Sequence, residues 1–216
     1  MTQSVSNSSG KKLIQIDVSS DTVCPWCFVG KRNLDKAITA SEDQFEFEIK
    51  WHPFFLNPSA PKEGVYRGLG LEYNISGLTG NTLDSHRLIY FAGQQGLDKQ
   101  HNLVEELFLG YFTQLNTLVI GSIVRILSIL AWIPNLENNC ESEKKLSPLP
   151  TSLVGVEGPA EFLEDPNNGL KEVNDDLKKY SANITGVPYY EINGKHKLSG
   201  GQPPEVFLRA FEAAAN

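Results

Sequence analysis

Two thiols lie between a strand pattern and a helix pattern in the stretch Asp21-Thr22-Val23-Cys24-Pro25-Trp26-Cys27. Residues 13–18, just before it, are β-branched and apolar enough to form a buried strand. Apolar residues after it recur at helical spacing as far as about residue 40. We therefore expect both thiols at the mouth of a helix that follows a strand, where this cysteine spacing is typical of redox chemistry.

A second strand pattern completes a βαβ unit. Residues 45–51 alternate apolar and charged side chains, as a half-buried strand does. A strand, a helix and a strand within about forty residues form a right-handed crossover between two parallel strands. Prolines and glycines from Pro58 onward then indicate a loop that leaves the sheet. Helical patterns follow from residue 81 or 82 to about 96, from 101 or 102 to about 113, at 160–164 and at 170–180.

The end of the chain predicts a ββα unit. Two extended patterns, at residues 187–192 and 195–198, flank Asn193-Gly194, and both of these residues tolerate the positive φ of a tight hairpin turn. Pro203-Pro204-Glu205 then opens a last helix, since proline is favoured in the first helical turn. The predicted order is therefore βαβ, a helical block, and ββα.

The two cysteines of the opening stretch are the candidate catalytic residues. With Pro25 in the first helical position, Cys24 is the N-cap, and its sulfur faces the free N–H groups of Trp26 and Cys27. Those groups and the helix dipole favour the thiolate, so we expect a depressed pKa and a nucleophilic role for Cys24. Cys27 lies one turn further into the helix and is the expected resolving thiol of a mixed disulfide.

Two other interpretations of the cysteine pair stay open, half of a zinc site and a pair of inert buried thiols. A zinc site needs two further ligands. The four histidines show no paired spacing, and the third cysteine, Cys140, lies in an atypical segment. The strand-helix context therefore favours redox chemistry, and we expect no metal.

A second feature points to the same site independently of the cysteines. Val187-Pro188 stands immediately before a predicted strand, where a cis X-Pro bond is expected. A cis bond would leave the backbone of Val187 free to pair with an extended substrate near Cys24. The alternative is an ordinary trans proline that opens an edge strand.

The length, composition and net charge limit the classes of protein and of binding partner that fit this sequence. The 216 residues are 40% hydrophobic, which is enough for one large domain or a compact domain with an insertion. A net charge of -7 argues against a nucleic-acid or anionic-membrane partner. Three cysteines are too few for a disulfide-stapled secreted scaffold. Residues 1–11 are expected to form a disordered tail without a secretory signal, so we expect the cytoplasm.

Residues 115–153 do not resemble their surroundings. Residues 115–133 are nearly all Leu, Ile and Val around Arg125, and residues 134–150 are polar and rich in proline. A membrane span would be at the short end of the required length and would place Arg125 near its middle, at a cost of about 2.5 to 3.5 kcal/mol. A buried core helix would need cover on every face. The third interpretation is a stretch that is foreign to the fold.

The chain resembles the DsbA-like thiol-disulfide oxidoreductases of the FrnE type, and among them most closely the plant members. The resemblance covers roughly residues 12–114 and 154–214. It is carried by Cys24-Pro25-Trp26-Cys27, Trp51-His52-Pro53-Phe54, Phe91-Ala92-Gly93-Gln94-Gln95-Gly96, Gly186-Val187-Pro188, Asn193-Gly194 and Ser199-Gly200-Gly201-Gln202.

The resemblance implies an α/β protein with a thioredoxin fold. Residues 12–58 and 184–216 would form the thioredoxin-like domain, and residues 59–183 an all-helical domain inserted between the βαβ and ββα halves. Cys24 and Cys27 would exchange disulfides, supported by Pro25 and Trp26 between them and by Val187 and Pro188 beside them. No cofactor is implied beyond exchange with glutathione or another thiol. The partners would be disulfide or dithiol substrates, either proteins or small molecules.

The atypical segment departs from this family's pattern. Where members continue with a polar loop and an amphipathic helix, residues 115–153 are unrelated sequence with an abrupt start and end. A retained intron or a mis-joined exon would produce this pattern. We hold this as a hypothesis that transcript reads across codons 114 to 154 test, and uninterrupted reads as the sole product would reject it.

Two other functions compete with the oxidoreductase. A glutathione-dependent transferase or isomerase of the kappa type shares the architecture, but it binds the glutathione thiolate with a Ser-like residue and has no role for a resolving Cys27. A non-catalytic interaction module would leave Cys24 with an ordinary pKa.

Overall fold

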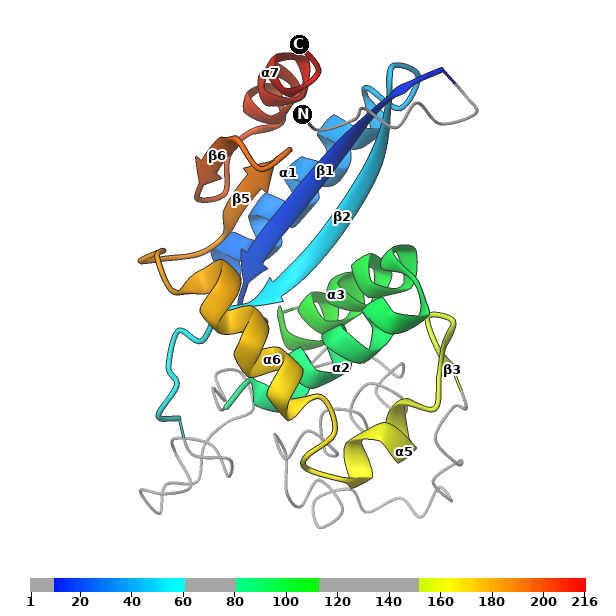
Figure 1. The fold of residues 1–216 in the computed structure, drawn as a ribbon, viewed down its shortest axis with the longest axis vertical. Helices are drawn as coiled ribbons and strands as arrows, with labels where there is room; N and C mark the ends of the chain where they lie inside the picture. The colour runs from blue at the N-terminus through cyan, green and yellow to red at the C-terminus, as the bar shows by residue number, and fades with distance from the viewer. Residues whose placement is uncertain (1–9, 61–80, 113–151) are drawn as a thin grey trace.

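The computed structural model describes residues 10–60, 81–112 and 152–216. Its central sheet has the strand order β2-β1-β5-β6 (Figure 1). The strands are β1 (Lys12–Ser20), β2 (Phe45–Pro53), β5 (Tyr189–Ile192) and β6 (His196–Ser199). β1 runs parallel to β2 and antiparallel to β5, and β6 is antiparallel to β5. The predicted parallel pair and the predicted hairpin are thus confirmed.

Helix α1 (Pro25–Thr39) connects the two parallel strands, and α7 (Pro204–Ala214) packs beside it at the end of the chain. α1 runs along the sheet behind β1 in Figure 1. The buried residues of α1 include Cys27, Leu34 and Ala37, which join one core with the strands. α7 adds Phe207 and Phe211 to the same core. The βαβ and ββα units therefore form the predicted thioredoxin fold.

The described chain between β2 and β5 is mostly helical. It contains α2 (Leu83–Gln95), α3 (Leu97–Phe112), α5 (Pro159–Glu164) and α6 (Leu170–Asp176), and a π-helical turn, η4 (Leu177–Ser181), continues α6. Two short antiparallel strands, β3 (Ser152–Leu153) and β4 (Val156–Glu157), precede α5. The limits of 59–183 for an inserted helical domain stay a prediction.

The start of α3 differs from the prediction. The sequence pattern predicts a new helix at residue 101 or 102, but α3 begins at Leu97. Gly96 alone makes the connection, with a φ of 149° that few other residues adopt. Its N–H donates to the carbonyl of Ala92 in α2, and its carbonyl accepts from Gln100 in α3. One glycine thus ends one helix and opens the next, so no loop separates them.

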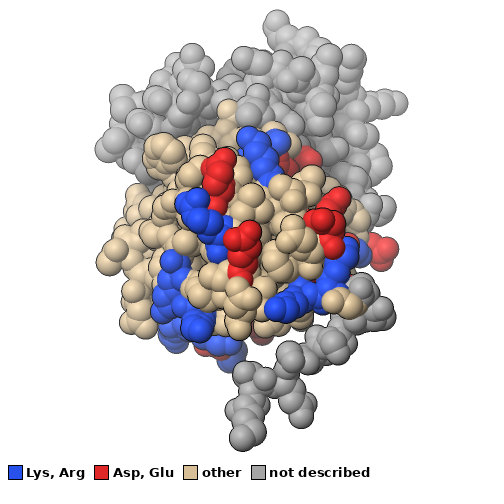
Figure 2. Space-filling view, turned by 90° about the horizontal axis from the view of Figure 1, so that it is seen from above, with Lys and Arg blue, Asp and Glu red and all other residues tan. Residues whose placement is uncertain are grey.

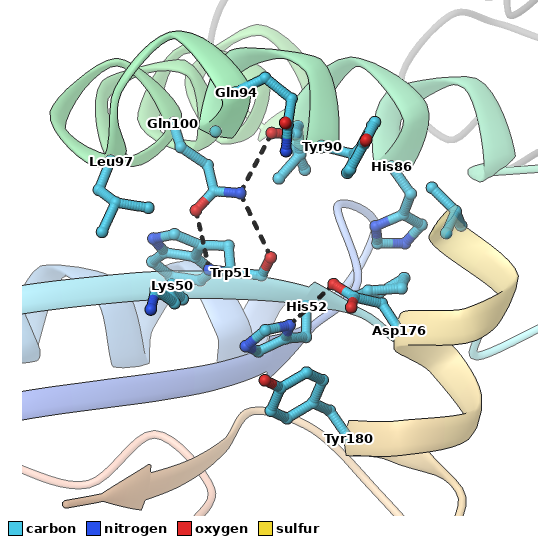
Figure 3. A pocket seen from close by; sticks show the side chains of 14 residues that line it. Lys50, Trp51, His52, His86, Tyr90, Gln94, Leu97, Gln100, Asp176 and Tyr180 are labelled. Carbon is cyan, nitrogen blue, oxygen red and sulfur yellow. Dashed lines mark hydrogen bonds and ion pairs between the residues drawn. The ribbon is translucent and has the colours of Figure 1, made fainter. Parts of the chain in front are cut away.

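The outer edge of β2 is covered by one side chain of α3. The Trp51 N–H donates to Gln100 Oε1 at 3.0 Å, and Gln100 Nε2 donates back to the Trp51 carbonyl at 3.4 Å (Figure 3). Gly93 makes room, since a Cβ at that position would lie 2.7 Å from Gln100 Nε2. The Gln100 amide takes the place of a neighbouring strand and blocks edge-to-edge pairing there.

Some expectations fall outside the described residues. These are the tail up to residue 9, the end of the predicted helix at 113, and residues 115–151 of the atypical segment. In the part of the chain that the structure describes, no helix has both the length and the apolar character to cross a membrane.

On the face seen in Figure 2, the described Lys and Arg side chains are interspersed with Asp and Glu.

Candidate active site

Cys24 occupies the N-cap of α1, as predicted. Pro25 takes the first helical position, and Cys24 itself is extended, with φ −88° and ψ 113°. The Cys24 carbonyl accepts the N–H groups of Cys27 and Phe28 and so starts the helix. The Cys24 N–H donates to the Asp21 carbonyl at 3.0 Å, which closes the turn between β1 and α1. The strand end and the helix start thus fix the position of the first thiol.

The two cysteines are buried, whereas the Trp26 side chain between them is exposed. Both cysteines are free, with Cys24 5% exposed and Cys27 fully buried. Trp26 between them is 63% exposed. The Cys24 sulfur is therefore the one that a substrate disulfide reaches first.

The pKa of Cys24 is lowered to about 7. The main cause is a hydrogen bond with the Cys27 thiol, which stabilises the Cys24 thiolate. Burial works against the charged form, and the N–H groups of Cys27 and Trp26 favour it. The negative charge of Asp21 also disfavours the thiolate and raises the pKa. A substantial fraction of Cys24 is thus thiolate at neutral pH, which is the nucleophilic form.

The pKa of Cys27 moves in the opposite direction. Burial raises it well above its ordinary value, and the charge that Cys24 carries adds to the rise. The Ser20 hydroxyl and the Asp21 N–H oppose this shift as hydrogen-bond donors to the sulfur. The environment therefore assigns the negative charge to Cys24 and the proton to Cys27.

The loop before β5 lies against the dithiol. The Cys24 thiol donates to the Val187 carbonyl with a sulfur-to-oxygen distance of 3.6 Å, and the Val187–Pro188 bond is cis. A Cβ on Gly201 would lie 3.2 Å from the Trp26 carbonyl, so the loop after β6 packs on the same site. All six residues predicted for the site, Cys24, Pro25, Trp26, Cys27, Val187 and Pro188, thus come from α1 and the β5 loop that faces it.

Sequence reasoning missed two buried polar residues on the other side of the turn. Asp21 is 1% exposed, and its Oδ2 accepts the Leu56 N–H at 2.8 Å, while Oδ1 has no hydrogen-bond donor among the described residues. His86 Nε2 lies 3.6 Å from that oxygen and donates to the Phe54 carbonyl at 3.2 Å. No local pattern connects α2 with the β1 turn, so only the fold could bring these residues together.

Tyr190 is the third residue that the sequence did not reveal. It is fully buried, and its hydroxyl has no hydrogen-bond partner among the described residues. Side chains alternate between the two faces of a strand, so the position of Tyr190 in β5 directs it into the core, but no local pattern indicates what its hydroxyl meets there.

A pocket of about 270 Å³ lies between β2 and the helices α2, α3 and α6 (Figure 3). His52 lies at its floor and is bonded through both ring nitrogens, at 2.8 Å to Asp17 and at 3.0 Å to Asp176. The His52 ring also stacks on Tyr180, with 3.5 Å between the ring centroids. His52 therefore connects β1 and β2 to α6.

A zinc site would need further ligands beside the two cysteines. Within residues 10–60, 81–112 and 152–216, no three His, Cys, Asp or Glu side chains gather closely enough to hold a metal ion. Cys140 lies outside the described residues.

Comparison with known proteins places this geometry in a family context. The family model for the DSBA-like thioredoxin domain matches residues 15–127, just over half of the chain. An uncharacterized protein of Bacillus subtilis, YwbO, is 46% identical over 46 residues, a match that spans only 21% of each chain.

Solved structures share the fold at low sequence identity. A probable DsbA oxidoreductase of Streptomyces coelicolor is 24% identical and has a TM-score of 0.63, over 93% of this chain and 89% of that one. A point variant of Wolbachia pipientis alpha-DsbA1 is 13% identical, with a TM-score of 0.51 over 95% and 87%. Pseudomonas aeruginosa DsbA2 is 16% identical, with a TM-score of 0.50 over 93% and 87%.

Proposed function

The chain belongs to the family of DSBA-like thioredoxin domains, and we propose that it is a thiol-disulfide oxidoreductase of the FrnE type that works through Cys24 and Cys27. The observation that carries the proposal is the opposite shift of two neighbouring thiols. The pKa of Cys24 falls to about 7, while burial raises that of Cys27. An attacking thiol is most effective when its pKa lies near the ambient pH, and Cys24 meets this condition.

The proposed reaction has two exchange steps. The Cys24 thiolate attacks one sulfur of a substrate disulfide, a mixed disulfide forms, and the other substrate sulfur leaves as a thiol after taking up a proton. Cys27 then loses its proton and attacks the Cys24 sulfur. The Cys24–Cys27 disulfide forms, and the second substrate sulfur leaves with a proton. The reverse sequence oxidises a dithiol substrate, so the same site supports either direction.

The surface around Cys24 supports a substrate with apolar or extended parts. Trp26 is 63% exposed and Val29 41% exposed on the first turns of α1. The backbone of Val187 lies within reach of the Cys24 sulfur. We propose that a disulfide-containing peptide or small molecule packs on Trp26 and pairs with the Val187 backbone. Glutathione is the proposed thiol partner, in the cytoplasm, and plant members of the FrnE type are the proposed nearest relatives.

The two competing functions do not require both thiols. A glutathione-dependent transferase of the kappa type would use one group at the helix N-terminus, so it would not need the hydrogen bond between the Cys24 and Cys27 thiols. A non-catalytic module would need neither the lowered pKa of Cys24 nor a buried second thiol.

The test is a trapping experiment with oxidised glutathione. Cys140 is replaced by Ser in every variant, so that the third thiol does not react. Cys27→Ser is expected to accumulate a stable mixed disulfide on Cys24, whereas the chain with both active-site thiols releases it and forms the Cys24–Cys27 disulfide. Cys24→Ser, the matched control, is expected to react far more slowly, because the Cys27 sulfur is buried. Equal reaction of the two single-thiol variants would reject the proposal.

A further inference from the structure

The Tyr190 hydroxyl lies directly under the helix that carries the dithiol. A Cβ on Gly30 of α1 would stand 2.2 Å from the Tyr190 hydroxyl oxygen and 3.0 Å from Pro188 Cγ. The hydroxyl thus fills the space that a side chain at position 30 would occupy. Residues three apart on a helix share a face, so the hydroxyl lies against the same face of α1 as Cys27. Cys27 and Gly30 are both buried on the inner face of α1.

The rest of the Tyr190 side chain is held firmly. Its backbone pairs with Val18 on one side and Leu198 on the other, in the middle of the sheet. Its ring packs edge-on against Phe207, with 4.9 Å between the ring centroids. The hydroxyl therefore cannot turn away to water, and it stays beside the helix.

A buried hydroxyl without a partner among the described residues calls for a physical reason, because removal from water is unfavourable unless a hydrogen bond replaces the lost one. Burial raises the pKa of Tyr190, and the negative charges of the two cysteines add to the rise, Cys27 more strongly than Cys24. The phenol therefore keeps its proton at neutral pH and can donate a hydrogen bond to an anion nearby.

We propose that the Tyr190 hydroxyl donates a hydrogen bond to the Cys27 sulfur when that sulfur becomes a thiolate, and that it thereby speeds the release of the mixed disulfide. In the reduced protein Cys27 is a thiol, and two donors, the Ser20 hydroxyl and the Asp21 N–H, already face its sulfur. A neutral thiol sulfur is a weak acceptor, so a hydrogen bond from the Tyr190 hydroxyl would contribute little in the reduced protein. Once the charge moves to Cys27, the third donor stabilises it in a site that water does not reach.

The step itself balances without any further reactant. The proton of Cys27 passes to the departing substrate sulfur, the bond between Cys24 and the substrate breaks, and the Cys24–Cys27 bond forms. Tyr190 keeps its own proton throughout and only shares it in a hydrogen bond. The inference rests on the proposed function, since a chain that never forms a mixed disulfide has no such step.

Tyr190→Phe tests the inference, because it removes only the hydroxyl. The full chain with Cys140→Ser is mixed rapidly with oxidised glutathione, and both steps are followed. We expect the second step, release of the Cys24–glutathione disulfide, to slow about threefold, because the lost hydrogen bond lowers the Cys27 thiolate fraction while the remaining, more basic thiolate is more nucleophilic. The first step, attack by Cys24, is expected to keep its rate. Tyr189→Phe on the same strand is the matched control and should leave both steps unchanged.

A second measurement avoids turnover altogether. In a Cys24→Ser background the alkylation rate of Cys27 depends on its thiolate fraction, and Tyr190→Phe is expected to lower this rate about threefold at each pH below the pKa. An unchanged alkylation rate, or an equal slowing of both exchange steps, would overturn the role of Tyr190. Failure of the proposed function would show differently, as the absence of any mixed disulfide on Cys24 in the unmodified chain.

Discussion

At the scale of single residues, the charge of Asp21 restrains the reactivity of Cys24. Its buried carboxylate raises the pKa of Cys24, against the donors that lower that pKa to about 7. We expect Asp21→Asn to lower the pKa of Cys24 further, because a neutral amide no longer disfavours the nearby thiolate. The alkylation rate of Cys24 as a function of pH measures the shift, with the exposed Asp43→Asn as control. A pKa that rises or stays unchanged in Asp21→Asn would contradict this role.

Gly30 is the residue that lets Tyr190 approach α1. In an ordinary helix, Gly→Ala is stabilising by roughly 0.5–1 kcal/mol. Here the new Cβ would stand 2.2 Å from the Tyr190 hydroxyl oxygen. We expect Gly30→Ala to reduce the free energy of unfolding by about 1–3 kcal/mol, as overpacked cores do. Urea unfolding measures this change.

The pair of substitutions provides a sharper check of the same contact. Tyr190→Phe removes the clashing atom, so Gly30→Ala should cost less in the Tyr190→Phe background than in the wild type. The contact with Pro188 Cγ at 3.0 Å remains, so the rescue is expected to be partial. Strictly additive effects of the two substitutions would show that the hydroxyl does not fill the space beside Gly30.

At the scale of elements, His52 of β2 contacts both α6, through Asp176, and the turn η4, through Tyr180. Burial opposes its charge, but the hydrogen bonds to Asp17 and Asp176 outweigh this and raise the pKa of His52 above its ordinary value. Ser181 of η4 adds a hydrogen bond to the Pro53 carbonyl at 2.5 Å. The contact that depends on protonation is therefore the one between His52 and its two carboxylates.

The raised pKa of His52 gives the contact a definite pH dependence. A histidine whose folded pKa exceeds the unfolded value of about 6.5 stabilises the fold fully below that value, and this contribution is lost as the pH rises through the folded pKa. We expect the difference in unfolding free energy between wild type and His52→Asn to be largest near about pH 6 and to shrink in alkaline solution. Urea unfolding over this range measures it. A difference that grows with pH would have the wrong sign.

Local sequence patterns predicted most of these elements, and their failures have physical causes. The Asn193-Gly194 hairpin and the N-cap at Cys24 depend on neighbouring residues only, and both are confirmed. The start of α3 was predicted wrongly because Gly96 joins two helices without a loop. The contact of Tyr190 with Gly30 joins residues that are distant in the sequence, and no periodicity reveals it.

At the scale of the whole molecule, a partly buried ion cluster around Lys31 connects α1, which carries the two cysteines, to α3. Lys31 on α1 is 2% exposed and lies 2.7 Å from Asp35 and 3.1 Å from Glu105 of α3. Trp51 of β2 donates through Nε1 to His101 Nδ1 at 3.0 Å, which leaves His101 Nε2 to donate to Asp35 at 2.8 Å. The cluster thus joins α1, α3 and β2 one turn beyond Cys27.

Lys31→Ala tests how far the fold depends on this cluster. The substitution removes a buried cation, but Glu105 keeps its ion pair with Arg32 and Asp35 its hydrogen bond with His101, so we expect it to lower the free energy of unfolding by about 1–3 kcal/mol. Lys36→Ala, at an exposed position of the same helix, is the control and should change it by no more than about 0.5 kcal/mol. Equal effects of the two substitutions would mean that the cluster contributes no more than a surface charge.

The most direct test of the redox site is the titration of Cys24 itself. The titration is made in the Cys140→Ser chain, which retains Cys27. Replacing Cys27 would remove the hydrogen bond that lowers the pKa of Cys24. The alkylation rate of Cys24, identified by its peptide, is measured against pH. We predict a midpoint at about 7. A midpoint at the ordinary cysteine value of about 8.5 would contradict the assignment of Cys24 as the nucleophile.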